Sequence, residues 1–223
     1  MDRYYSDRLS AQRLQRCYEI APDRTKQYLE AEIRHVVNRI REKDAVLELG
    51  CGYGRLLERL VESCRSLVGI DTSMASLKMA KNHLCPRIEF HLLQTNASTL
   101  PFQDSCFDVV VCVQNGISAF KLEPIDLMKE SIRVTRSGGQ CIFSSYSHKF
   151  WEARLEWFRL QSEEGLLGEI DWNQTVNGVI VCKDGFRATT FGEDDFMQLV
   201  AQLDATAQLI EVDESSLFCE IRV

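Results

Sequence analysis

The chain has 223 residues, a formal net charge of −7 and a hydrophobic content of 45%, which is ordinary for a soluble enzyme. Its length fits one α/β domain with a substantial core better than two domains. The negative charge argues against a general nucleic-acid binder, which needs a basic face to neutralise phosphates. No apolar stretch is long enough to span a membrane, and the N-terminal sequence MDRYYSDRLS is too polar for a signal peptide. We therefore expect a cytoplasmic protein without a membrane partner.

The nine cysteines are scattered and odd in number. Several lie inside apolar strand-like segments: Cys112, Cys141, Cys182 and Cys219. This placement predicts buried reduced thiols rather than disulfides. No pair has the spacing of zinc ligands and the four histidines lie elsewhere, so we expect no metal site.

Charge is uneven along the chain. The segment up to Lys43 has an excess of arginine and lysine, whereas the segment from Asp184 onward is acidic. The simplest interpretation is a solvated helix face at each end.

The first 43 residues have apolar positions at helical spacing, interrupted at Pro22. Two helices are therefore predicted before the first strand. Tyrosines are frequent in this region, at Tyr4, Tyr5 and Tyr18. An aromatic face would attract a cation electrostatically.

Ala45–Leu49 is an apolar run typical of a buried parallel strand. It is followed by Gly50, Gly52 and Gly54 and then by a helical pattern over Arg55–Val61. Glycines in such a turn permit positive φ and allow a ligand to approach the backbone, and the helix start offers unpaired N–H groups. The next apolar strand, Ser66–Ile70, ends at Asp71, about twenty residues after the glycines, where a carboxylate can accept hydrogen bonds from ribose hydroxyls. This spacing fits either a dinucleotide or an adenosyl ligand.

The loop itself favours the adenosyl ligand. It reads Glu48-Leu49-Gly50-Cys51-Gly52-Tyr53-Gly54, with an acid two residues before the first glycine, instead of the nicotinamide fingerprint Gly-x-Gly-x-x-Gly. It resembles the first motif of class I S-adenosylmethionine-dependent methyltransferases. NASTLPFQDSCFD, from Asn96 to Asp108, resembles their second motif, and RVTRSGGQCIF resembles their Leu-x-Pro-Gly-Gly passage. The resemblance covers roughly Asp44 to Ser145.

The remaining segments follow the order that this family implies. The predicted core elements are a helix over Thr72–Leu84, strands over Ile88–Leu92 and Phe107–Val113, a helix over Ile125–Val134, a turn over Ser137–Gly139 and a strand over Gln140–Ser145. Further on come an aromatic-rich helix, KFWEARLEWFRL, and a hairpin of Val179–Cys182 and Phe186–Phe191 around Lys183–Gly185. A helix over Glu193–Leu203 and an antiparallel pair, Leu209–Val212 with Leu217–Val223, close the chain.

The resemblance implies a doubly wound α/β fold with a seven-stranded, mostly parallel sheet and an antiparallel last strand. We expect a single methyltransferase domain with four parts. These are an N-terminal helical lid (1–43), a cofactor-binding core (44–145), a substrate cap inserted before the last helix (146–192), and the last helix with the closing strand pair (193–223).

The resemblance also implies S-adenosyl-L-methionine as cofactor and assigns residues to it by their place in the motifs. The cofactor-binding candidates are Glu48, Gly50, Cys51, Gly52, Tyr53, Gly54, Asp71, Thr72, Met74, Asn96, Ala97, Gln114 and Asn115. Many members have an acid where this chain has Asn96, and an amide oxygen can still contact the adenine amino group. The catalytic candidates are His148 and Tyr18, and the substrate candidates are Tyr4, Tyr5, Tyr146, Asp171, Trp172, Asn173 and Arg187.

The implied reaction is in-line displacement at the sulfonium methyl group, for which the protein has mainly to align donor and acceptor. A nitrogen acceptor only has to arrive unprotonated, whereas a hydroxyl acceptor requires a base or a metal. With no metal cluster in the sequence, we predict a nitrogen (amine or imidazole) or sulfur acceptor on a small molecule. DNA-base methylation is disfavoured because Asn115-Gly116 stands in place of the Asn/Asp-Pro-Pro-aromatic sequence of DNA amino-methylating enzymes.

Three alternatives stay open on the sequence. The acceptor is a protein or transfer RNA, which only the arginine-rich N-terminal helices favour. The protein is a nucleotide-dependent oxidoreductase, which the glycine spacing disfavours. Or it is a non-catalytic partner protein that binds an adenosyl ligand without turnover. The sequence specifies neither the acceptor nor the oligomeric state.

Overall fold

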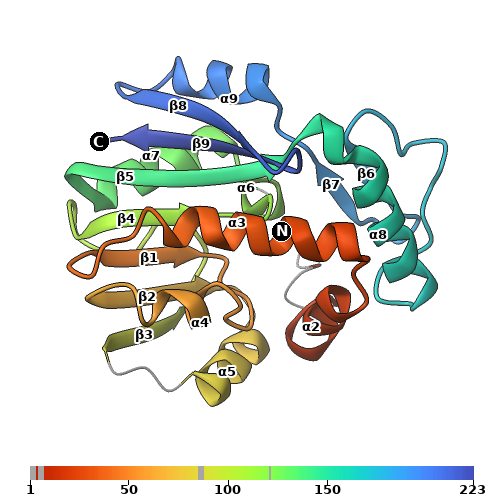
Figure 1. Ribbon diagram of the computed structural model, residues 1–223, viewed down its shortest axis with the longest axis horizontal. Helices are drawn as coiled ribbons and strands as arrows, with labels where there is room; N and C mark the ends of the chain where they lie inside the picture. The colour runs from red at the N-terminus through yellow and green to blue at the C-terminus, as the bar shows by residue number, and fades with distance from the viewer. Residues whose placement is uncertain (1–3, 5–7, 85–87, 121) are drawn as a thin grey trace.

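The computed structural model describes residues 4, 8–84, 88–120 and 122–223, so the candidate Tyr5 lies outside the described residues. Seven strands form one sheet in the order β3-β2-β1-β4-β5-β9-β8 (Figure 1). They are β1 (Ala45–Leu49), β2 (Ser66–Asp71), β3 (Glu89–Gln94), β4 (Phe107–Cys112), β5 (Thr135–Tyr146), β8 (Thr206–Val212) and β9 (Ser216–Arg222). The first five run parallel, and β9 is antiparallel to both β5 and β8. This arrangement confirms the predicted fold class.

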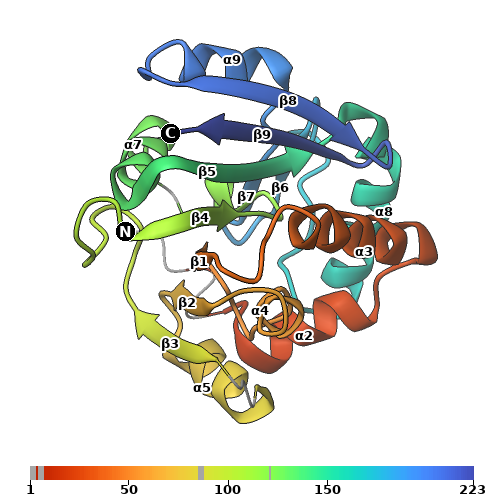
Figure 2. The same cartoon turned by 60° about the vertical axis from the view of Figure 1, so that its left-hand side comes forward.

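Helices cover both faces of the sheet (Figures 1 and 2). They are α2 (Ala11–Glu19), α3 (Asp23–Val37), α4 (Leu57–Leu60), α5 (Met74–His83), α6 (Gly116–Ala119), α7 (Pro124–Val134), α8 (Trp151–Glu163), α9 (Glu193–Val200) and a 3₁₀ turn, η1 (His148–Phe150). Successive residues of a strand point to opposite faces, so Val46 packs with α3, α4 and α5 while Leu47 packs with α7 and α9. The sheet is thus buried on both sides, which explains the continuous apolar runs of β1 and β4.

One local prediction is wrong in part. The segment Ser137–Gly139 is not a separate turn but an irregular stretch within β5, where the pairing with β4 shifts between Thr135 and Gln140 and Gly138 has φ of +79°. Gly138 N donates to Val223 O over 2.7 Å, and Val223 N donates to Gly139 O over 3.2 Å. The C-terminal end of the chain therefore holds this irregular stretch in place, an effect of a partner more than eighty residues away in the sequence.

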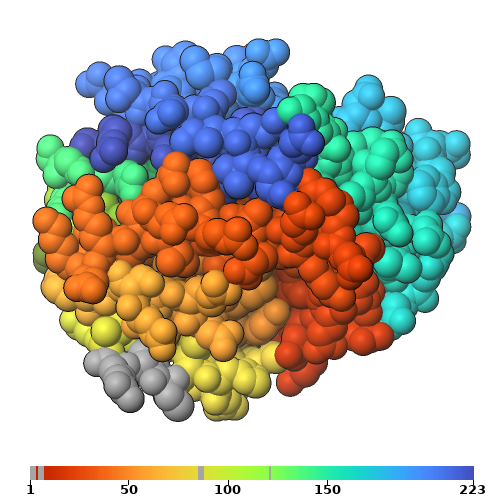
Figure 3. Space-filling view, viewed as in Figure 1, coloured from red at the N-terminus to blue at the C-terminus, as the bar shows by residue number. Residues whose placement is uncertain are grey.

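A third hydrophobic cluster lies beyond the carboxyl ends of the parallel strands. It combines α2 with the cap segment, which contains α8 and the two-stranded sheet of β6 (Val179–Val181) and β7 (Arg187–Thr189). Trp157 Nε1 of α8 donates a 2.7 Å hydrogen bond to Cys17 O of α2. In the space-filling view, the N-terminal helices and the cap lie side by side at the molecular surface (Figure 3).

Folding also brings the basic and acidic parts of the chain together. Arg24 pairs with Asp213 at 2.7 Å, and Arg8 pairs with Asp184 at 3.2 Å. The charged side chains at both ends remain largely exposed, as the interpretation of solvated helix faces predicts, and some of the N-terminal arginines also find acidic partners far along the sequence. The four cysteines expected in the core are buried free thiols. Within the described residues, no helix is both long enough and apolar enough to cross a bilayer.

Candidate functional site

A cavity of about 770 Å³ opens at the carboxyl ends of β1, β2 and β4. One end is formed by the glycine loop and the residues after β2: Glu48, Gly50, Cys51, Gly52, Tyr53, Asp71, Thr72, Ser73, Met74, Thr95 and Asn96. α2 lies over the glycine loop, and the other end is formed by the end of β5, α8 and the loop before β7. These parts contribute Tyr4, Leu14, Cys17, Tyr18, Tyr146, Trp157, Phe158, Gln161 and Phe186. Segments far apart in the sequence therefore close one chamber.

The glycine loop crosses the tip of β2. Gly50 N donates to Ile70 O over 2.9 Å, and Gly52 N donates to Asp71 Oδ2 over 2.9 Å. Gly52 has φ of +54°, and a Cβ atom there would lie 3.1 Å from Leu14 Cδ2 of α2. The left-handed backbone conformation thus favours glycine at this position, and a side chain there would press on Leu14 of α2.

Asp71 is fixed by the backbone around it. Its Oδ1 accepts a 2.7 Å hydrogen bond from Ser73 N, in addition to the bond that Oδ2 accepts from Gly52 N. Burial raises the pKa of Asp71, and these backbone N–H groups act in the opposite direction. A carboxylate oxygen can accept more than one hydrogen bond, so both oxygens of Asp71 retain capacity for ligand hydroxyls.

Glu48 is the buried acid of the loop. It lines the cavity, is 5% exposed, and its Oε2 has no hydrogen-bond partner among the described residues. Burial raises the pKa of Glu48 to about 8, although the nearby Arg55 acts to lower it. An ionised carboxylate here requires a cation, which a ligand ammonium group would supply.

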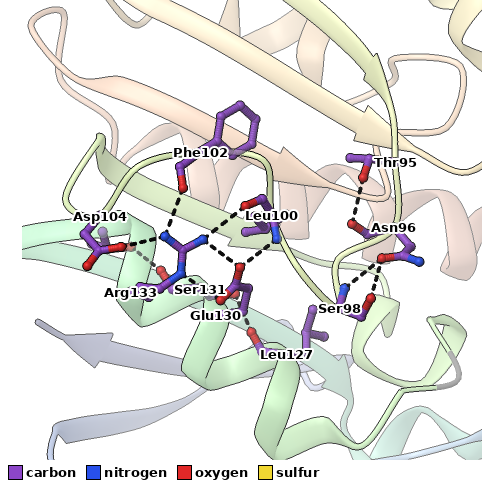
Figure 4. A network of polar contacts seen from close by, with 11 residues as sticks. Thr95, Asn96, Ser98, Leu100, Phe102, Asp104, Leu127, Glu130, Ser131 and Arg133 are labelled. Carbon is purple, nitrogen blue, oxygen red and sulfur yellow. Dashed lines mark hydrogen bonds and ion pairs between the residues drawn. The ribbon is translucent and has the colours of Figure 1, made fainter.

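The loop after β3 is held from α7, as Figure 4 shows. Arg133 donates to Phe102 O over 2.9 Å and to Leu100 O over 3.1 Å. Glu130 accepts a 2.6 Å hydrogen bond from Leu100 N and pairs with Arg133. These contacts fix the course of the second motif next to the cavity.

Asn96 lines the cavity, but its side-chain oxygen accepts hydrogen bonds from Ser98 N and Oγ, at 3.1 and 2.5 Å (Figure 4). The predicted contact of this oxygen with an adenine amino group is therefore not available in this arrangement, and the amide nitrogen is the group left for a ligand. Ala97 is fully buried in the core beside α7 and does not line the cavity.

The two residues after β4 have different environments. Both have positive φ, and Gln114 lines the cavity, where its Oε1 accepts a 2.7 Å hydrogen bond from the Tyr18 hydroxyl. Asn115 does not line the cavity. Its Nδ2 donates to Thr189 O over 2.9 Å, and its Oδ1 accepts from Ser145 Oγ over 2.8 Å. Asn115 thus anchors β7 to the end of β5.

Aromatic rings connect the glycine loop to the cap. The centroids of Tyr53 and Tyr18 are 5.9 Å apart, as are those of Tyr18 and Trp157. The contacts continue from Trp157 to Phe158 at 5.8 Å and from Phe158 to Phe186 at 5.9 Å. These rings give the chamber flat apolar walls.

The structure brings many of the predicted residues into this cavity and leaves others outside. Those that line it are Tyr4, Tyr18, Glu48, Gly50, Cys51, Gly52, Tyr53, Asp71, Thr72, Met74, Asn96, Gln114 and Tyr146. Those that do not are Gly54, Ala97, Asn115, His148, Asp171, Trp172, Asn173 and Arg187. His148 is exposed in η1, where the chain has already turned away from the end of β5, and this placement removes support for its role as a base.

Sequence reasoning missed the lining residues of α8. Its buried residues are Arg154, Trp157, Phe158 and Gln161, which recur at the spacing of one helix face. The signal in the sequence was the presence of two polar residues, Arg154 and Gln161, at the helical spacing of the aromatic residues.

Residues 47–143 match the protein family described as Methyltransferase domain. This segment of the chain is therefore similar to known methyltransferase domains. The chain is 32% identical to malonyl-[acyl-carrier protein] O-methyltransferase of Marinomonas sp. over 56% of this chain and 47% of that protein. It is 32% identical to demethylmenaquinone methyltransferase of Renibacterium salmoninarum over 46% of this chain and 41% of that protein. The chain thus spans about half the length of the curated relatives that it matches.

A solved structure of a putative S-adenosyl-L-methionine-dependent methyltransferase from Methanococcus maripaludis has the same fold. The TM-score is 0.64 at 16% identity, covering 93% of this chain and 90% of that one. The family match confirms the resemblance seen in the sequence, the enzyme class of the methyltransferase domain and S-adenosylmethionine as the cofactor of this class.

Proposed function

We propose that this protein transfers the methyl group of S-adenosylmethionine to a small molecule. The observation that carries this proposal is the single cavity that joins the glycine loop and Asp71 to an aromatic chamber under α2 and the cap. In-line methyl transfer requires two partners held in alignment away from water, and a shared enclosed cavity provides that. The sulfonium already carries the driving force, so the protein's main task is positioning.

In this proposal the strand tips bind the cofactor. Asp71 accepts hydrogen bonds from the ribose hydroxyls, because both of its oxygens are oriented by backbone N–H groups. Glu48 binds the ammonium of the methionine part, which supplies the cation that its buried carboxylate lacks. The glycine loop lets the ligand approach the backbone closely. Thr72 and Met74 cover one side of the adenosine.

We assign the helices of residues 1–43 as the lid and residues 146–192 as the substrate cap. The contact between them supports this division, since Arg13 of α2 donates to Gly165 O over 2.7 Å and to Leu166 O over 3.0 Å. Both parts contribute aromatic side chains to the same chamber. Closing it therefore depends on lid and cap together.

The prediction of a nitrogen or sulfur acceptor atom needs revision. The relatives give no support to a nitrogen or sulfur acceptor, and the Marinomonas protein is named as an O-methyltransferase. No histidine or lysine is found among the described lining residues, so the acceptor end offers no amine or imidazole base. We therefore favour an oxygen whose proton is lost easily, such as that of a phenol, over an aliphatic alcohol.

The alternative of a protein or transfer RNA acceptor loses the feature that favoured it. The N-terminal arginines are engaged within the fold, as the pairs Arg8–Asp184, Arg16–Glu164 and Arg24–Asp213 show. These pairs offset part of the positive charge of the basic segment. A small-molecule acceptor is the better fit to the enclosed aromatic chamber.

The proposal is tested by incubating the purified protein with methyl-labelled S-adenosylmethionine and a cell extract, and identifying by mass which component gains the label. We expect a labelled small molecule with the wild-type protein and none with Asp71→Ala. Label found in protein or RNA would contradict the small-molecule acceptor. Tight binding of the cofactor without transfer to any component would favour the non-catalytic partner protein.

A further inference from the structure

Gln161 has an unusual position on α8. Trp157 and Phe158 precede it by four and three residues, so the three side chains share the helix face that lines the cavity. Gln161 is only 3% exposed. Its amide nitrogen is buried and forms no hydrogen bond with any described residue. A buried amide without a partner destabilises a fold compared with an apolar side chain, so its presence at a cavity wall points to a partner outside the polypeptide.

The backbone of Gln161 is fixed while its amide group can turn. The backbone carbonyl oxygen of Gln161 accepts hydrogen bonds from Leu166 N and Leu167 N, at 2.9 and 3.2 Å. The terminal torsion of a glutamine has a broad energy profile. A small rotation of the amide therefore presents its nitrogen to the cavity without moving the helix.

The groups around Gln161 select a flat molecule. Phe158 packs against Phe186 of the cap, and Trp157 uses its only donor on Cys17 O of α2. These neighbours offer ring faces and edges rather than free hydrogen bonds. An aromatic ring fits between such walls better than a flexible polar chain does.

Charge at this end of the cavity selects a neutral molecule. Among the described lining residues the acids are Glu48 and Asp71, both at the glycine-loop end. Arg55 is the cation of that lining; it donates to Leu29 O over 3.4 Å and lies 5.0 Å from the ring centroid of Tyr18. The charged groups beside the cap rings are engaged within the fold: Asp184 accepts a 2.7 Å hydrogen bond from the Tyr4 hydroxyl, and Arg154, 5.3 Å from the ring centroid of Phe158, donates to Gly178 O over 2.8 Å. A charged acceptor would have to compete with these partners.

We infer that Gln161 donates a hydrogen bond to a carbonyl or hydroxyl oxygen on an uncharged aromatic acceptor molecule and thereby determines acceptor specificity. This inference rests on the proposed function, since it places the methyl acceptor at the cap end of the cavity. It names a chemical class, a neutral ring that carries an oxygen. It also explains why a polar residue is kept on the buried face of α8.

The test uses two probes of nearly the same shape, 2-acetylnaphthalene and 2-ethylnaphthalene, which differ by the carbonyl oxygen. Their affinities are measured by calorimetry on the full chain saturated with S-adenosylhomocysteine. We expect the acetyl probe to bind about tenfold more tightly to the wild type, as one satisfied hydrogen bond implies. Gln161→Met, which keeps the volume and removes the amide, should equalise the two affinities. Gln198→Met, at an exposed glutamine of α9, should keep the tenfold preference.

A second readout separates recognition from a structural role. Without ligand, Gln161→Met should raise the melting temperature, because it removes an unpaired buried amide. A lower melting temperature with the acetyl preference retained would overturn the inference. Tighter binding of a trimethylammonium-substituted naphthalene than of the acetyl probe would overturn it too. Failure of the proposed function has a different signature, namely no binding of S-adenosylhomocysteine to the wild-type protein.

Discussion

The two ends of the cavity are built in different ways. The glycine-loop end is made from consecutive residues at the tips of adjacent strands, and backbone N–H groups fix its key carboxylate, as in the Gly52 and Ser73 bonds to Asp71. The cap end is made from side chains of α2, β5, α8 and the loop before β7. The first depends on local sequence and the second on long-range packing. A change at the first should therefore affect cofactor binding, and a change at the second should affect the acceptor or the closing of the chamber.

The largest effect is expected from Asp71→Ala. It removes the acceptor of the proposed ribose hydrogen bonds and of two backbone N–H groups. We expect the binding free energy of S-adenosylhomocysteine to weaken by about 2 kcal/mol or more, measured by calorimetry. Asp204→Ala, at an exposed position before β8, serves as the control and should bind as the wild type does. Equal affinities for the two variants would remove Asp71 from the cofactor site.

The variant Glu48→Gln should reveal how this buried acid at the glycine-loop end makes the stability of the fold depend on pH. The folded-state pKa is raised from 4.5 to about 8, so the folded state holds this proton more tightly than the unfolded state does. Wild-type stability should therefore fall as pH rises from 4.5 towards 8, and the variant should lack this loss. The free energy of unfolding, measured in urea across this pH range, checks the prediction. Glu62→Gln, at an exposed position, is the control and should behave as the wild type does.

The affinity for the ligand should depend on pH in the opposite direction to the stability of the fold. If the ionised Glu48 binds the ammonium of the cofactor, the affinity for S-adenosylhomocysteine should rise as pH increases towards 8 in the wild type and stay level in Glu48→Gln. Parallel curves for both proteins would show that Glu48 does not contact the ligand charge.

A smaller effect is expected where lid and cap meet. Arg13→Ala removes the hydrogen bonds to Gly165 O and Leu166 O. Because these bonds hold α2 over the glycine loop, S-adenosylhomocysteine should dissociate about threefold faster in stopped-flow measurements, with little change in the association rate. Lys26→Ala, on the exposed side of α3, should leave both rates unchanged. An unchanged dissociation rate in Arg13→Ala would show that α2 does not retain the ligand.

The smallest effect is expected from Trp172→Ala in the cap. This tryptophan is 57% exposed and does not line the cavity, although the sequence made it a substrate candidate. We expect KM and kcat for the identified acceptor to stay within about twofold of the wild-type values, as for most exposed positions. A larger rise in KM would show that the acceptor extends beyond the chamber towards residues 171–178.

The sequence by itself determined the fold class and most of the cofactor end. A buried strand, a glycine loop and an acid at the next strand tip are local features, and the parallel sheet places them side by side whatever the rest of the chain does. The same local reasoning failed in part at Ser137–Gly139, where hydrogen bonds to Val223 keep the two glycines within β5 as an irregular stretch instead of a separate turn.

Only the tertiary structure decided the acceptor end. His148 and Trp172 had suitable chemistry but face solvent, whereas Gln161 lies in the cavity wall with no marking motif. The sequence also did not show that the basic and acidic ends of the chain meet in the fold, as Arg24 and Asp213 do. The physical reason is the same in each case: side chains from distant segments meet through packing, and packing depends on the whole chain at once.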